Sequence, residues 1–167
     1  MLFWALRTLR GVTVPMNHKR WAWAAVDWAL RVGLAGVFLT ASILKLKNPA
    51  GFATQVTSYN LFPELSNVVA MTVPSTELLA AVALVALPPA WRRAGAVLLV
   101  VLLVGFTGGV LWAWTSGVQA DCGCFGENSP DIGLLPVARN LGLITLGIAI
   151  LWVDRRRARS PESSPAQ

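Results

Sequence analysis

Apolar residues gather along the chain in four long stretches, each about as long as a helix that crosses a lipid bilayer. Such a helix needs about 20 consecutive, mostly apolar residues. The stretches cover residues 24–44, 67–87, 94–114 and 133–153. Segments containing Pro, Gly, Asn and Asp separate them, and these residue types interrupt helices. The pattern therefore predicts an all-α protein, a transmembrane bundle of four helices.

Three of the four stretches contain ionisable residues, which are costly in lipid and usually face a partner inside the bundle. In the first stretch, Asp27 and Arg31 are spaced i, i+4 and can pair on one face of a helix. Arg31 can alternatively extend its charge toward the lipid headgroups. Glu77 lies near the middle of the second stretch and Arg139 near the start of the fourth. We expect Glu77 and Arg139 to face the interior of the bundle, each with a partner.

The chain divides into three parts around this predicted bundle. Residues 1–20 form a basic segment, residues 21–153 the four-helix domain, and residues 154–167 a basic tail that ends rich in Ser and Pro. Residues 160–167 have the composition of a disordered segment. Residues 1–14 contain Arg7 and Arg10 and no cleavage site, so we expect a helix on the membrane surface or a translation start at Met16, and no signal peptide.

Composition supports a membrane location, with the lipid bilayer as the first partner. Apolar residues make up 55% of the chain and charged residues 13%, whereas soluble domains have about 25% charged residues. This excludes an ordinary soluble enzyme, and no soluble basic module is present that would bind nucleic acid.

The distribution of Lys and Arg predicts the orientation of the bundle. Ten lie in the N-terminal segment, the turn between the second and third stretches, and the tail, against Lys45 and Lys47 on the other side. Because cytoplasmic loops carry the excess of basic residues, we expect both termini in the cytoplasm. The protein would then be multi-pass in the cell membrane, with the loop at residues 115–132 outside.

The most specific motif lies in that loop, where residues 121–126 read DCGCFG. Cys122 and Cys124 lie on the side of the membrane where disulfides persist. With one residue between them, the two sulfurs can join only in a small, strained ring, and Gly123 supplies the backbone freedom for it. Strained disulfides tend to be labile or catalytic, so the pair is a candidate redox centre.

Two other interpretations of the cysteines remain. The pair can be structural or idle, although a bridge between near neighbours removes little chain entropy. It can also capture a soft metal, but a closed site needs further ligands. The only histidine, His18, falls on the opposite side of the membrane, so no metal site is predicted.

A second group of polar residues is expected beneath the cysteine loop. We expect Glu77 to pair with Lys45 or Arg139, and Asn140 to add hydrogen bonds. Positive charge there would favour a thiolate, the reactive form of cysteine. One alternative is a structural ion pair that fixes helix register. Another is that Lys45, at the end of the first helix, is a simple anchor that extends its charge toward the headgroups.

The sequence also resembles the MauE branch of the DoxX-like membrane proteins, a family of small four-helix redox-associated proteins. The resemblance covers about residues 32–150. The matching blocks are FLTASILKLKNPAGF (38–52), VPSTELLAA (73–81), DCGCFG (121–126) and VARNLGL (137–143). The cysteine block is the specific one, and the other three support it by their order.

The resemblance implies a role in thiol–disulfide traffic outside the cytoplasm. MauE is associated with maturation of the disulfide-rich small subunit of methylamine dehydrogenase, alongside a thioredoxin-like partner. Carried over, this makes Cys122 and Cys124 the pair that exchanges disulfides with a thioredoxin-like or client protein. It leaves open whether the chain is an enzyme, a thiol–disulfide oxidoreductase.

No cofactor motif is recognisable. Quinone-linked disulfide-forming enzymes of the membrane relay electrons between two cysteine pairs, whereas this chain has one pair and no cysteine within a span. Direct quinone reduction remains an alternative. Two further alternatives are a non-catalytic subunit or scaffold of an oxidoreductase complex, and a pathway for a small molecule or ion around Glu77.

Overall fold

The computed structural model describes residues 18–60, 63–118, 120–127 and 129–159. The surface helix or alternative start expected within residues 1–16, and the disordered segment expected at residues 160–167, lie outside these ranges.

Four long helices form the bundle, as the hydrophobic pattern predicts. They are α1 (His18–Lys47), α3 (Ser66–Ala86), α4 (Pro89–Thr115) and α5 (Leu134–Arg159). Each is long and apolar enough to cross a membrane. The connections contain the short helix α2 (Pro49–Ser58), a turn of 3₁₀ helix, η1 (Pro63–Leu65), and a four-residue strand, β1 (Cys124–Glu127). The all-α, four-helix prediction is confirmed, and the short strand is the feature that it lacked.

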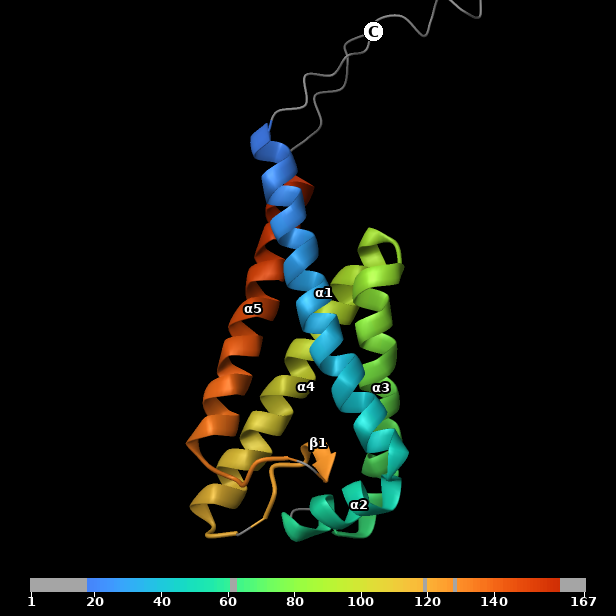
Figure 1. Ribbon diagram of the computed structural model, residues 1–167, viewed down its shortest axis with the longest axis vertical. Coiled ribbons are helices and arrows are strands. Elements are labelled where there is room, and N and C mark those ends of the chain that lie inside the picture. Colours follow the sequence, from blue (N-terminus) through green and yellow to red (C-terminus); the bar gives the residue numbers. More distant parts are fainter. Residues whose placement is uncertain (1–17, 61–62, 119, 128, 160–167) are drawn as a thin grey trace, which may run out of the picture.

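The long helices run alternately up and down, so that chain neighbours are antiparallel (Figure 1). Helix α1 packs against α3 and α5, while α4 packs against the other sides of the same two helices. The start of α1 and the end of α5 lie together at one end of the bundle (Figure 1). Helix α2 and strand β1 lie at the opposite end, where β1 contacts both α1 and α2.

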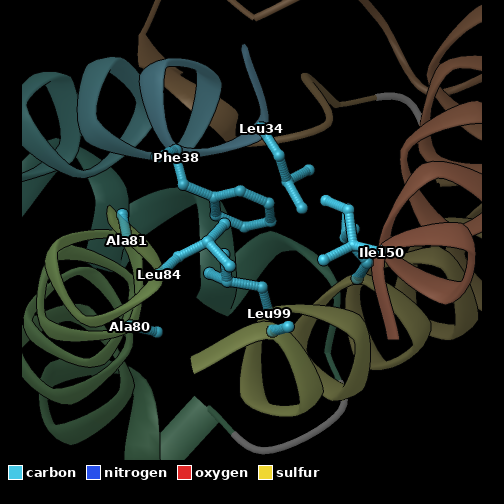
Figure 2. Packing of buried hydrophobic residues seen from close by; sticks show 10 residues of the cluster. Leu34, Phe38, Ala80, Ala81, Leu84, Leu99 and Ile150 are labelled. Carbon is cyan, nitrogen blue, oxygen red and sulfur yellow. The ribbon is translucent and has the colours of Figure 1, made fainter. Parts of the chain in front are cut away.

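The core contains side chains from all four long helices. Leu34 and Phe38 of α1 point toward Leu84 of α3, Leu99 of α4 and Ile150 of α5 (Figure 2). Small residues let the helices approach closely. At Gly95 of α4 an added Cβ would lie 2.8 Å from the Ala80 carbonyl oxygen of α3, so this crossing requires glycine.

The outer faces of the helices are apolar, the reverse of the pattern on a soluble protein. Exposed large apolar side chains occur on every long helix, among them Val32, Leu79, Val101, Leu141 and Ile148. An apolar surface of this extent needs an apolar environment. It fits the hydrocarbon core of a bilayer, and the chain is a multi-pass membrane protein.

Candidate functional site

The cysteine motif forms a tight turn that closes one end of the bundle. The Cys122 N–H donates to the Pro130 carbonyl at 2.9 Å, and the Ile132 N–H donates to the Ala120 carbonyl at 3.0 Å. These bonds join the two arms of the loop. Gly123, between the cysteines, has a φ of +65°, a left-handed conformation that glycine adopts without a steric penalty. The local sequence thus holds the two cysteine side chains at adjacent positions of one turn.

Both cysteines are free thiols, and both are buried. Their exposed fractions are 4% for Cys122 and 9% for Cys124, and they pack with Val110 of α4 and Val137 of α5. Helix α2 lies against the turn, because a Cβ added at Gly123 would be 3.2 Å from the Gln55 side-chain oxygen. The expected loop is therefore in place, but its sulfurs face the protein interior.

Tyr59, just after α2, holds the turn from outside. Its hydroxyl donates to the Cys122 carbonyl at 2.6 Å and lies 3.4 Å from the Asp121 carbonyl. Burial, together with the nearby thiols, raises the pKa of Tyr59, so it stays a neutral donor. Sequence reasoning missed this residue, although a signal was present: it is the only tyrosine of the chain, in the polar segment beside the first span.

The two thiols differ in their readiness to ionise. A hydrogen bond with the Cys124 thiol and the nearby Arg139 guanidinium outweigh burial and lower the pKa of Cys122 to about 6. The same bond with Cys122, together with burial, raises the pKa of Cys124, whose thiol also lies 3.5 Å from the Cys122 carbonyl oxygen. The lowered pKa favours the thiolate form at Cys122, and the raised pKa favours the protonated form at Cys124.

Arg139 reaches the turn from the second turn of α5. Its guanidinium stacks 4.6 Å from the centroid of the Phe125 ring, and its Nη2 lies 3.4 Å from Oδ1 of Asn140. Arg139 Nε and Asn140 Nδ2 are buried and have no hydrogen-bond partner among the residues that the structure describes. Two hydrogen-bond donors therefore remain unsatisfied directly below the cysteines.

Lys45 and Glu77 form an ion pair inside the bundle. Lys45 Nζ lies 2.7 Å and 2.9 Å from the two carboxylate oxygens of Glu77. It also lies 4.5 Å from the Phe106 ring centroid and 5.2 Å from that of Phe52. The partner of Glu77 is thus Lys45 and not Arg139. The alternative in which Lys45 is a simple anchor is wrong, because its side chain is 1% exposed.

A small cavity brings these groups together under the turn. Its polar lining is Cys124, Lys45, Glu77, Arg139 and Asn140, and its other walls are apolar side chains of α1, α4 and α5 with Phe125. The volume available to the centre of a water-sized molecule is about 20 Å³, room for little more than one water. Among the described residues, no three His, Cys, Asp or Glu side chains gather as metal ligands would.

A second ion cluster lies at the other end of the bundle. Arg31 lies 3.2 Å from Asp27 on its own helix, as the i, i+4 spacing predicts, and 2.6 Å from Asp154 on α5. Arg31 is 2% exposed, so the alternative in which it extends to the headgroups is wrong. Asp154 was missed as its partner because it follows the fourth apolar stretch. The cluster ties α1 to α5 far from the cysteines.

Comparison with known proteins agrees with this architecture. The family model described as methylamine utilisation protein MauE matches residues 23–153, which include α3, α4, most of α1 and α5, and both cysteines. The chain belongs to the MauE family. The methylamine utilization protein MauE of Paracoccus denitrificans is 41% identical over 130 residues, which are 75% of this chain and 68% of that protein. No solved structure gives a significant match. The resemblance to MauE is confirmed, whereas the DoxX-like affiliation stays a prediction.

Proposed function

We propose that this MauE-family protein exchanges disulfides through Cys122 and Cys124 with a thioredoxin-like or client protein outside the cytoplasm, and so supports the maturation of that protein. The observation that carries the proposal is the asymmetry of the pair. Cys122 is poised as a thiolate, and Cys124 lies beside it as a protonated thiol. A nucleophile next to a resolving cysteine is the arrangement that thiol–disulfide exchange requires.

In the first step, the Cys122 thiolate attacks one sulfur of a disulfide in the partner. A sulfur–sulfur bond forms between Cys122 and the partner, the partner's own disulfide breaks, and one partner thiolate leaves. Arg139 stabilises the attacking thiolate by charge and hydrogen bonding.

In the second step, Cys124 loses its proton and attacks the Cys122 sulfur. The intermolecular bond breaks, the second partner thiolate leaves, and Cys122 and Cys124 are joined. The partner has gained two electrons and the pair has lost two. The reverse sequence oxidises a partner dithiol, and the direction depends on the potentials of the two proteins.

Access to the sulfurs requires a local movement, because both are buried. Among the described residues, the contacts on the α2 side of the turn include the Tyr59 hydroxyl bond and the close approach of Phe52 and Gln55 to Gly123. We propose that a partner reaches Cys122 when α2 moves away from the turn. Local openings of this kind draw on regions with few contacts.

The proposed location of the exchange is the outer face of the cell membrane, with both termini in the cytoplasm. The excess of Lys and Arg at the end of the bundle away from the cysteines supports this orientation. Lys45 is one of the two basic residues counted on the cysteine side, and Glu77 neutralises it. The difference in positive charge between the two ends of the bundle is therefore larger than the count alone gives. Direct quinone reduction is not part of the proposal, because the cavity beside Cys124 is little larger than a water.

The test is to trap the mixed disulfide in intact cells. Cys124→Ser leaves the attacking thiolate without its resolving partner, so it should accumulate a covalent adduct that dithiothreitol releases. Cys122→Ser should accumulate much less, and the double variant none. A membrane-impermeant thiol reagent added to the same cells reports whether the pair faces outward.

Equal trapping by the two single variants would contradict the assigned order of attack. If no adduct forms and the cysteine-free protein still fully supports maturation of the partner, the result would favour the alternative of a non-catalytic scaffold. Loss of function in Glu77→Gln but not in the cysteine-free protein would instead favour a small-molecule or ion pathway.

A further inference from the structure

We propose that the cavity beneath the cysteine turn is a binding site for a small monovalent anion, of halide size, that Arg139 and Asn140 hold when Cys122 carries no thiolate. The inference rests on the redox chemistry proposed above, because it concerns what happens to the site when the pair becomes a disulfide. Nothing in the name of the family or its relative assigns such a site.

The charges around the cavity balance only while Cys122 is a thiolate. Around the cavity the described side chains supply two cations, Lys45 and Arg139, and one carboxylate, Glu77. Both oxygens of Glu77 lie within hydrogen-bond distance of Lys45, so among the described side chains of the cavity and the turn it is the Cys122 thiolate that balances Arg139. Asp121 does not help, because it lines the hollow on the outer side of the turn, with Trp114 and Asp131.

Disulfide formation removes that balance. The thiolate and the thiol become a neutral disulfide, and two electrons and one proton pass to the partner disulfide. The net charge of the site therefore becomes more positive by one. Arg139 is partly buried and its Nε is fully buried, so leaving its charge without a counter-ion costs free energy. Arg139 cannot give up its proton to escape that cost, so an anion from solution is the remaining way to neutralise it.

The cavity is also lined by residues with unsatisfied hydrogen-bond donors. Asn140 is 2% exposed and lines the cavity, yet its Nδ2 has no partner among the described residues, and the same holds for Arg139 Nε. Buried polar groups are nearly always hydrogen-bonded. Two N–H donors in a space little larger than one water, with apolar walls, suit a small anion better than a large polyatomic one.

The test uses the full chain in detergent and removes the thiolate without oxidation. In Cys122→Ser, sodium bromide should raise the unfolding temperature by a few degrees relative to sodium gluconate at the same ionic strength, because gluconate is too large for the cavity. In the reduced wild type at pH 8, where the thiolate balances Arg139, the two salts should have equal effects. Asn140→Leu and, separately, Arg139→Gln should each abolish the bromide effect in Cys122→Ser, whereas Arg93→Gln at the other end should preserve it.

A second arm measures the oxidised-to-reduced ratio of the wild-type pair in a dithiothreitol buffer. Above the dissociation constant of bromide, a tenfold increase in bromide should raise that ratio by up to about tenfold. Three results would each overturn the anion site. They are no effect of bromide, an equal effect on the reduced wild type and on Cys122→Ser, and an effect that survives both Asn140→Leu and Arg139→Gln. A pair that oxidises and traps its partner but ignores bromide leaves the proposed function standing, whereas a pair that never oxidises overturns both.

Discussion

Lys45 Nζ on α1 lies within 2.9 Å of both carboxylate oxygens of Glu77 on α3, and each side chain is 1% exposed. The two residues join α1 to α3 inside the bundle. Because Lys45 also packs against Phe52 of α2 and Phe106 of α4, four helices meet at this one ammonium group.

Replacing one member of this ion pair should destabilise the protein more than replacing both. Lys45→Met leaves the Glu77 carboxylate buried alone and should lower the free energy of unfolding by about 3 kcal/mol or more. Lys45→Met combined with Glu77→Leu removes both charges and should recover most of that loss. Unfolding in mixed micelles with increasing sodium dodecyl sulfate measures the three proteins. If the double variant is as unstable as the single one, the pair contributes more than mutual neutralisation.

The cluster at the other end should tolerate a single loss better. Asp154→Leu removes the 2.6 Å contact with Arg31, but Arg31 keeps Asp27 at 3.2 Å. The expected cost is about 1–2 kcal/mol, the range of one hydrogen bond to a charged group. The same unfolding titration applies, and alkylation of the cysteines should be unchanged. Faster alkylation in Asp154→Leu would show that the two ends of the bundle are coupled.

The reactivity of Cys122 should follow its lowered pKa. Below pH 6 the thiol is protonated and alkylation is slow; the rate should rise through about pH 6 and level off above pH 7. Cys124→Ala removes the hydrogen bond that lowers this pKa most, and Arg139→Gln removes the nearby charge. Both should move the midpoint upward, toward the usual value of about 8.5, and reduce the rate at pH 7 several-fold.

Iodoacetamide labelling, with the labelled residue identified by mass spectrometry, gives these profiles. Arg93→Gln, at the far end of the bundle, is the control for a general loss of positive charge. A midpoint near 8.5 in the wild type would contradict the assignment of Cys122 as the thiolate.

Replacing Gly123 should loosen the turn from α2. Gly123→Ala places a Cβ at a φ of +65° and 3.2 Å from the Gln55 oxygen, so it should be strained by about 1–2 kcal/mol and push α2 outward. Gly117→Ala is the matched control, because Gly117 has a φ of +71° but nothing within 4 Å of the added Cβ. Cysteine labelling should accelerate in Gly123→Ala alone. Equal acceleration in both variants would mean that backbone strain, and not contact with α2, governs access.

Much of the fold could be predicted from the sequence because only long apolar segments are stable in the hydrocarbon core of a bilayer, and such segments are visible in the composition. Four apolar stretches of bilayer length allow little except four helices, and the structure places a helix over each. The prediction was less accurate at the helix ends. Helix α1 begins at His18 and α5 continues to Arg159, since charged residues at a membrane boundary can continue a helix that the apolar pattern alone does not reveal.

The candidate site was only partly predictable. The CGC spacing identified Cys122 and Cys124, and the cost of charge in lipid singled out Lys45, Glu77 and Arg139. The pattern could not choose between Lys45 and Arg139 as the partner of Glu77, because both lie toward the same end of the bundle. Tyr59 was missed although it is the only tyrosine of the chain, because its bond to the turn joins segments far apart in the sequence.

By itself, the sequence determined the number of helices, the membrane as their environment, and the chemistry available at one turn. These are properties of composition and local spacing, which act before any long-range contact forms. Only the tertiary structure decided that the sulfurs are buried, that the pKa of Cys122 is lowered, and that Arg139 and Asn140 keep unsatisfied donors beside them. Each of these depends on distances between α2, α5 and the turn, and such distances are set by helix packing that no local pattern encodes.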